Sequence, residues 1–173
     1  MTEIRPATPA DATEIARIYN QGIEERTSTF ETELREAEDF ERRIADREAP
    51  PLMVAEEDGK VVGWAGLSPY SGRACYSGIG EASMYIDREA RRRRVGMRLG
   101  EALGREAARR GYWKIIGLLL ADNEQSIAFT QASGARVVGT LRNHARLDGR
   151  WRDVVIIEVL LREIPILSDD VTA

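Results

Sequence analysis

Four consecutive arginines, residues 91–94, mark the part of the chain with the clearest chemical potential. They follow a short apolar segment (84–86) and lead through Val95 and Gly96 into a segment with helical spacing (97–110). This order predicts a strand, a positively charged turn and a helix. Unpaired backbone N–H groups and the helix dipole at such a helix start attract anions. The arrangement therefore predicts a phosphate site, which a pyrophosphate would fill better than a single phosphate.

Composition limits the class of protein. A chain of 173 residues with an ordinary apolar fraction is expected to form one domain with its own core. The net charge of −4 argues against a general nucleic-acid binder, and we expect no nucleic-acid partner. A single cysteine, Cys75, excludes an internal disulfide and fits a reducing compartment. Because the chain has only this one cysteine and one histidine, a zinc site is improbable, and we expect no metal.

No signal peptide or membrane-spanning apolar segment is recognisable, so we expect a cytoplasmic protein without a membrane partner. The first half of the chain then reads as a strand (3–5) and a helix that begins at Thr8 with Asp11 completing a capping box. The buried face of this helix is predicted to contain Ala12, Ile15, Ala16, Tyr19 and Ile23. A loop (26–32), a charged helix (36–46) and two strands (52–56 and 60–67) joined at Asp58-Gly59 follow.

The second half begins with a turn-rich loop (68–76) and a strand (78–86) ahead of the arginine turn. The helix after the turn (97–110) would bury Leu99, Ala102, Leu103 and Ala107 and end at Gly111. A near-continuous apolar run (113–120) predicts a strand buried on both faces. A short helix (123–133) and two strands (136–141 and 151–161) complete the domain, with a polar loop (142–150) between the strands and a frayed tail (165–173). This order predicts a layered α/β domain with a mixed sheet.

Three segments together carry a resemblance to a known family: EASMYIDREARRRRVGMRLGEAL (81–103), NEQSIAFTQASGA (123–135) and LRNHARLDGRWRDV (141–154). With the opening of the chain they resemble the GCN5-related N-acetyltransferases, and within them the branch of phosphinothricin and methionine sulfoximine acetyltransferases. The resemblance extends over about residues 2–162. It implies one N-acetyltransferase domain (1–173) with a mixed, mostly antiparallel central sheet flanked by helices on both faces. It also implies acetyl-CoA as co-substrate, a small-molecule amine as acceptor and a homodimer.

The family's acetyl-CoA loop has the pattern Arg/Gln-x-x-Gly-x-Gly/Ala. Arg91 and Gly96 match it, whereas Arg94 replaces the first glycine of the motif and Arg92 replaces another glycine usual in this branch. Glycine adopts positive φ without a Cβ penalty, and arginine there costs about 1 kcal/mol. The added guanidinium groups nevertheless suit the pyrophosphate and the 3′-phosphate of CoA. The competing interpretation is a solvated charge run.

The resemblance places one set of residues at the cofactor and one at the chemistry. Glu81 aligns with the family's catalytic glutamate and would act as the base, through burial or a relay water. A backbone N–H of the strand would stabilise the oxyanion. Asn123 fits a cofactor contact and a helix N-cap equally well, while Thr130 stands where relatives often carry His or Tyr. The full cofactor set is Met84, Tyr85, Ile86, Arg91, Arg92, Arg93, Arg94, Val95, Gly96, Met97, Asn123 and Ser126.

The acceptor pocket implied by the resemblance contains Phe30, Arg73, Tyr76 and Ser83. Arg73 would hold the α-carboxylate or the phosphinyl group of an amino-acid-like substrate in bidentate fashion, or else be a surface loop residue. Ser71 and Ser77 replace basic residues of that loop, which predicts a less positive pocket than in the resistance enzymes. We expect Cys75 to be a small buried apolar residue and His144 to lie in a surface loop.

Three functions follow from these residues. The first is direct transfer of acetyl from acetyl-CoA to the primary amine of a small amino-acid-like substrate in a ternary complex. The second is acetylation of protein N-termini or lysines, for which a wide groove would be the sign. The third is a non-catalytic acyl-CoA-binding protein, favoured by the substituted glycines and opposed by the retained Glu81 and Asn123. The identity of the acceptor amine is left open by the sequence.

Overall fold

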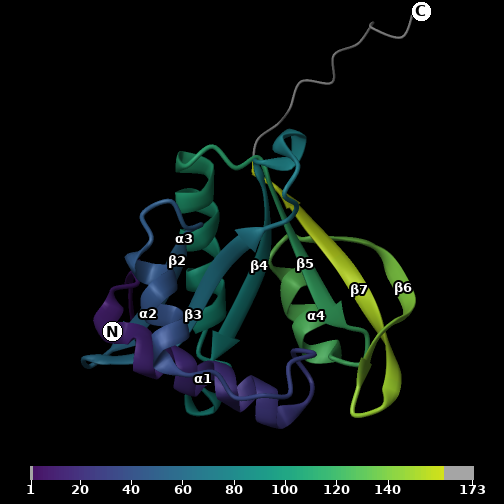
Figure 1. Cartoon of the computed structure of the whole chain (residues 1–173), viewed down its shortest axis with the longest axis horizontal. Helices are drawn as coiled ribbons and strands as arrows, with labels where there is room; N and C mark the ends of the chain where they lie inside the picture. The colour runs from purple at the N-terminus through teal and green to yellow at the C-terminus, as the bar shows by residue number, and fades with distance from the viewer. Residues whose placement is uncertain (1, 162–173) are drawn as a thin grey trace, which may run out of the picture.

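The fold is built on one seven-stranded sheet in the computed structural model, which describes residues 2–161 (Figure 1). The strand order is β1-β2-β3-β4-β5-β7-β6, and every neighbouring pair is antiparallel except β4 and β5. This mostly antiparallel mixed sheet confirms the predicted fold class. The strands are β1 (Glu3–Pro6), β2 (Leu52–Glu57), β3 (Lys60–Pro69), β4 (Ile79–Ile86), β5 (Lys114–Leu120), β6 (Arg136–Leu147) and β7 (Arg150–Leu160).

Helices cover both faces of the sheet. Helices α1 (Ala12–Glu25) and α2 (Ala37–Ala45) lie on one face, and α3 (Val95–Arg109) and α4 (Glu124–Ala132) lie on the other (Figure 1). Because side chains alternate along a strand, each face has its own core. On the α1 side Ile15 and Ile18 pack with Val54 and Trp64. On the α3 side the core contains Met53, Ala65, Leu67, Leu99, Leu103 and Ile115.

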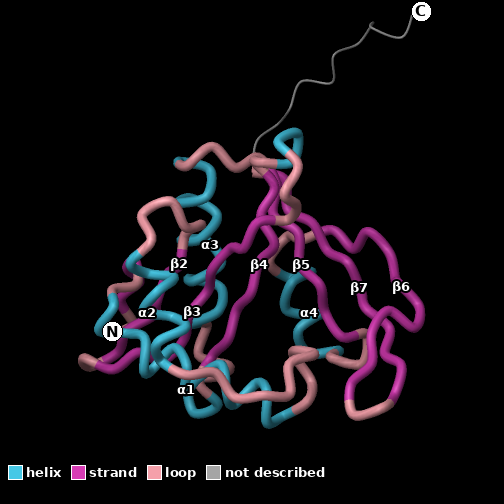
Figure 2. The backbone as a smooth tube through the Cα atoms, viewed as in Figure 1, coloured by secondary structure: helices cyan, strands magenta, loops and turns pink. Residues whose placement is uncertain are grey.

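Strands β4 and β5 are paired over only a short length. Three register pairs join them, the last of which is Glu81 with Ile116, and beyond this pair the two strands diverge (Figure 2). On its other side β4 stays paired with β3 up to Ile86. In residues 82–86 of β4, the backbone groups that face β5 therefore have no strand partner. The divergence creates an opening at the middle of the sheet.

The prediction that residues 142–150 form a polar loop is wrong. Strand β6 continues to Leu147 and β7 starts at Arg150, so a long hairpin occupies this segment. The two-residue turn consists of Asp148 at φ 48° and Gly149 at φ 77°, the positive values of a type I′ turn. His144 is exposed as expected, but within a strand. Strand β6 lies at the edge of the sheet and is largely exposed on both faces, so its second half is mostly polar and its sequence there resembles a loop.

Two further expectations need correction. The strand β5 is not buried on both faces, because Leu118 is 38% exposed where no helix covers the α1 side of the sheet. Helix α3 begins at Val95, two residues before the predicted start. The predicted tail 165–173 lies outside the described residues. No helix among residues 2–161 has the length and apolarity needed to cross a membrane.

The start of α1 is fixed to the sheet by an ion-pair network. Asp11 is 6% exposed and accepts hydrogen bonds from Arg5 Nη1 at 2.7 Å and Nη2 at 2.8 Å. The Asp11 carboxylate also accepts a hydrogen bond from the backbone N–H of Thr8 at 2.7 Å. This bond is the one that the Asp11 side chain contributes to the predicted capping box. Arg5 in turn pairs with Glu56 of β2 at 2.6 Å. The hydrogen bonds from Arg5 lower the pKa of Asp11 to about 2, against 3.8 for a free aspartate.

We predict that Asp11→Asn lowers the free energy of unfolding by about 2 kcal/mol at pH 7. Because the pKa of Asp11 is depressed in the folded state, the unfolded chain binds more protons between about pH 4 and pH 2. The contribution is complete above the unfolded pKa and is lost as the pH falls towards the folded pKa. Urea denaturation at a series of pH values measures the difference between the wild type and the variant.

The control is Glu24→Gln, which removes an exposed pair with Arg88 and should change stability much less. A difference between wild type and Asp11→Asn that stays constant from pH 7 to pH 2 would contradict the linkage.

Candidate active site

A cavity of about 530 Å³ opens where β4 and β5 diverge. Its walls come from the second half of β4, the arginine turn, the start of α3, the end of β5 and the start of α4. Residues 27 and 28, after α1, close one end. Eleven of the twelve predicted cofactor residues line it: Met84, Tyr85, Ile86, Arg91, Arg92, Arg94, Val95, Gly96, Met97, Asn123 and Ser126.

The arginine turn adopts the backbone that glycines would favour. Arg92 and Arg94 both have φ 63°, in the left-handed region. Arg94 is also the residue that immediately precedes helix α3. The two positions at which the family pattern expects glycine are therefore the two that carry positive φ. The turn is formed despite a Cβ cost of about 1 kcal/mol at each position.

The four arginine side chains divide into two pairs. Arg91 Nη2 is 2.9 Å from Glu25 Oε2, and Arg91 Nε donates to the carbonyl of Ile86 at 3.2 Å. Arg93 points away from the cavity and pairs with Glu57 at 2.5 Å. Arg92 and Arg94 line the cavity and have no carboxylate within 4.0 Å among the described residues. The turn is thus secured by two arginines, and the other two leave their charge available to an anion.

The start of α3 adds backbone donors to this charge. Its first N–H groups have no partner within the helix, and the positive end of the helix dipole faces the turn. A Cβ on Gly96 would lie 3.1 Å from the Phe129 ring, so glycine lets α3 and α4 approach closely there. Backbone donors, the helix dipole and two uncompensated guanidinium groups together make this end of the cavity suited to phosphates.

Asn123 connects both walls of the cavity. Its Oδ1 accepts from the backbone N–H of Ser126 at 3.0 Å and caps α4. Its Nδ2 donates to the carbonyl of Thr27 at 2.8 Å, so it holds the loop after α1 against the start of α4. The N-cap interpretation of Asn123 is confirmed, and its cofactor contact stays a prediction. Thr130 Oγ1 donates to the carbonyl of Ile127 within α4.

Glu81 occupies the last paired position before the strands diverge. Strand alternation directs its side chain to the α1 face, as for Ser83 and Tyr85, while Ala82, Met84 and Ile86 face α3. Ser68 of β3 is its cross-strand neighbour, and the Ser68 hydroxyl donates to the Glu81 carbonyl at 3.4 Å. Glu81 is half-buried, and its carboxylate has no hydrogen bond or ion pair within the described part of the chain. Its carboxylate is therefore open to a group that approaches on this face.

Tyr85 forms one wall of the cavity and belongs to an aromatic cluster under α1. Its ring stacks on Trp64 at 5.0 Å and meets Tyr19 edge to face at 4.7 Å. Its hydroxyl donates to the carbonyl of Ser28 at 3.3 Å, and burial raises its pKa. This hydrogen bond ties β4 to the loop after α1.

The predicted acceptor residues lie outside the cavity lining. Arg73 is exposed in the 70–78 loop, with its guanidinium 5.6 Å from the centre of the Tyr76 ring. Tyr76 also meets Tyr70 edge to face at 5.6 Å, and Phe30 is half-buried in the loop after α1. The structure brings the cofactor set together, whereas the acceptor set is spread over three elements. The expectation that Cys75 is buried is wrong, because it is exposed in this same loop.

Several cavity residues had no recognisable signal in the sequence. Thr27 and Ser28 reach the cavity because Arg26, the residue after α1, has a φ of 58° and turns the chain back towards α4. Four more lining residues belong to none of the predicted site sets: Glu25, Leu119, Gln125 and Phe129. The capping pattern around Asn123 was the one local clue to where this loop docks.

Comparison with known proteins agrees with this geometry. Residues 4–156 match the acetyltransferase (GNAT) domain family. The phosphinothricin N-acetyltransferase of Streptomyces viridochromogenes is 32% identical over 155 residues, which cover 88% of this chain and 84% of that protein.

Two solved structures extend the comparison. The ribosomal-protein-alanine N-acetyltransferase of Brucella melitensis superposes with a TM-score of 0.85 at 31% identity, covering 91% of this chain and 99% of that one. The phosphinothricin acetyltransferase of Sinorhizobium meliloti, in complex with acetyl-CoA, superposes with a TM-score of 0.84 at 25% identity, covering 92% of this chain and 88% of that one. The chain belongs to the GNAT acetyltransferase family and is an N-acetyltransferase.

We predict that Arg94→Gly is more stable than Arg94→Ala by about 1 kcal/mol, because both remove the guanidinium but only glycine removes the positive-φ penalty. Denaturant unfolding of the two variants measures this difference. Equal stabilities would contradict the account of strain in the turn.

We further predict that Asn123→Ala lowers the free energy of unfolding by about 1 kcal/mol, because α4 loses its cap. Asn123→Asp keeps the capping acceptor but loses the donor to Thr27, so its stability should stay near that of the wild type. Amide hydrogen exchange in residues 28–31 should accelerate in both variants. Unchanged exchange in Asn123→Asp would show that the contact with Thr27 does not hold the loop.

Proposed function

We propose that this enzyme transfers the acetyl group of acetyl-CoA to the primary amine of a small amino-acid-like acceptor, by direct attack in a ternary complex. The observation that carries the proposal is the cavity at the β4–β5 divergence, which combines unpaired β4 backbone with the arginine turn. One domain comprising residues 1–173 would perform the reaction.

The cofactor is proposed to enter with its pyrophosphate at the turn. The N–H groups of residues 91–97 and the guanidinium groups of Arg92 and Arg94 would bind the phosphates. The pantetheine arm would then run along β4 and pair with the backbone of residues 84–86. Asn123 and Ser126 at the start of α4 would contact it from the β5 side. One backbone N–H of β4 would stabilise the oxyanion that forms on the thioester carbonyl.

The amine is proposed to approach from the α1 face, where Glu81 has a free carboxylate. Only the unprotonated amine carries the lone pair that attacks, so Glu81 would accept its proton, directly or through a water. Collapse of the tetrahedral intermediate expels the CoA thiolate, whose conjugate thiol has a pKa of about 8.5 and needs little help from an acid. Holding both substrates in contact supplies much of the rate.

The acceptor side is proposed to include Phe30, Arg73, Tyr76 and Ser83. Arg73 would bind the polar end of the acceptor side chain from the 70–78 loop. A small amino-acid-like acceptor is supported by the phosphinothricin acetyltransferases among the relatives. The likeness to a ribosomal-protein-alanine acetyltransferase supports a second candidate function, acetylation of a peptide amino terminus. An alanyl peptide in the amine screen tests it.

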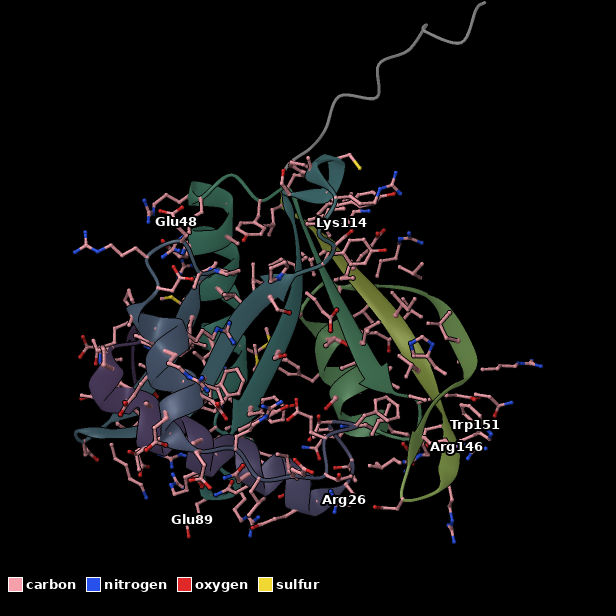
Figure 3. The ribbon with its side chains drawn as sticks, in the orientation of Figure 1. Arg26, Glu48, Glu89, Lys114, Arg146 and Trp151 are labelled. Atoms are coloured by element: carbon pink, nitrogen blue, oxygen red, sulfur yellow. The ribbon has the colours of Figure 1, made fainter. Side chains whose placement is uncertain are left out.

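The assembly is proposed to be a homodimer in the cytoplasm. Trp151 is 54% exposed on β7 and stacks under the Arg146 guanidinium at 4.6 Å, on the outer hairpin of the sheet (Figure 3). Val138 on β6 is 47% exposed. Exposed apolar side chains on a sheet edge suit burial against a second copy. The free thiol of Cys75 fits a reducing compartment.

Calorimetric titration with acetyl-CoA, followed by an amine screen, tests the function. We expect micromolar binding by the wild type and acetylation of at least one free L-amino acid. In Glu81→Gln, acetyl-CoA affinity should stay within about threefold, while kcat falls by about 10²–10⁴ because the base is lost.

Glu89→Gln is the control. Glu89 is an exposed carboxylate outside the cavity lining, and its removal should leave kcat unchanged (Figure 3). No acetyl-CoA binding by the wild type, with binding restored in Arg94→Gly, would reject the cofactor role of the arginine turn. Binding without turnover of any amine would instead support a non-catalytic acyl-CoA-binding protein.

A further inference from the structure

One cation on the acceptor face of the sheet lacks a counter-ion. Arg43 of α2 is half-buried, and its Nη2 donates to the carbonyl of Leu67 at 2.7 Å. The other half-buried arginines of residues 2–161 all pair with carboxylates: Arg5, Arg17, Arg26 and Arg152. Arg43 has no carboxylate within 4.0 Å in this part of the chain. Its charge is the exception among the arginines that are removed from water.

A half-buried guanidinium without a counter-ion is unfavourable. Burial lowers the pKa of Arg43, and no nearby carboxylate opposes this shift. Of the five N–H donors of a guanidinium, the described contacts employ Nη2 alone. Buried charges in proteins are normally paired or hydrogen-bonded throughout. The remaining donors of Arg43 are therefore suited to an anion that arrives with the substrate.

The position of Arg43 relative to Glu81 follows from the strand register. Its Nη2 lies 2.7 Å from where a Cβ on Gly66 would be, on the α1 face, so the absence of a side chain at residue 66 makes room for it. Gly66 is opposite Ser83, and Ser68 is opposite Glu81. Two residues along a strand span roughly 7 Å. The guanidinium is thus one side-chain row from the proposed base, on the same face.

We propose that Arg43 binds the α-carboxylate of the acceptor and thereby selects free α-amino acids. The inference rests on the proposed function. The amine and the carboxylate of an α-amino acid are attached to one carbon, so a cation one row from Glu81 holds the carboxylate while the amine faces the base. A guanidinium matches a carboxylate with two parallel hydrogen bonds. Arg73, in the outer loop, is left for the far end of the side chain.

The first test uses the wild type and a pair of acceptors that differ only in the α-carboxylate. L-Phosphinothricin and 3-aminopropyl(methyl)phosphinic acid form one such pair, and each L-amino acid accepted in the screen gives another with its decarboxylated amine. The matching α-amide controls for the change in amine basicity. We expect kcat/KM to fall at least tenfold for both carboxylate-free acceptors. Equal kcat/KM for the acid and the amine would overturn the inference.

The second test compares Arg43→Gln with Arg42→Gln, a neighbour on α2 whose side chain is 77% exposed. Glutamine can still donate to the Leu67 carbonyl, and thermal unfolding reports any structural damage. We expect Arg43→Gln to raise KM for the amino acid at least tenfold, with little change for its decarboxylated amine or in acetyl-CoA affinity. Arg42→Gln should match the wild type.

Equal losses on both acceptors in Arg43→Gln would assign Arg43 a structural role and reject the inference. A wild type that acetylates no amino acid would reject the proposed function itself. A wild type that acetylates amino acids without regard to the α-carboxylate would reject the role of Arg43 alone.

Discussion

The divergence of β4 from β5 is the constraint on which the rest of this molecule depends. A continuous sheet would satisfy the backbone of β4 on both sides and leave no room for a substrate. Here pairing stops after Glu81 and Ile116. The cost of unpaired backbone in a protein interior is high, so the open segment needs a partner. A ligand that carries its own amide groups can supply the missing hydrogen bonds. The same break places the Glu81 carboxylate at the point where the sheet opens.

The arginine turn shows how charge and backbone conformation compete. Glycine would form the turn without strain, and this chain instead has Arg92 and Arg94 at φ 63°. The guanidinium groups of the alternate residues Arg91 and Arg93 are paired with Glu25 and Glu57. The strained residues are therefore also the uncompensated ones. Strain of about 1 kcal/mol at each is small beside the attraction that two free cations offer a pyrophosphate in a partly enclosed site.

Local patterns predicted most of the fold. Helical spacing located α1 and α3, and Asp58-Gly59 located the hairpin between β2 and β3. The same Asp-Gly signal at Asp148-Gly149 stands among polar residues, which predict a loop, yet edge strands tolerate polar residues on both faces. Most of the cavity wall was predictable because residues 84–97 are nearly contiguous in sequence. Thr27, Ser28 and Arg43 were not predictable, since only tertiary packing brings them to the sheet, and a helix as charged as α2 is usually a solvated surface.

The two faces of the sheet carry different kinds of polar groups. The α3 face contributes backbone donors and cations that suit a phosphate-rich cofactor. The α1 face contributes Glu81 and, in Arg43, a guanidinium whose charge no side chain of residues 2–161 neutralises. Since a charge withdrawn from water is maintained at a cost, we explain its retention one side-chain row from the Glu81 carboxylate by a substrate that brings the opposite charge. In our proposal a zwitterionic acceptor would satisfy both groups at once, with its ammonium at Glu81 and its carboxylate at Arg43.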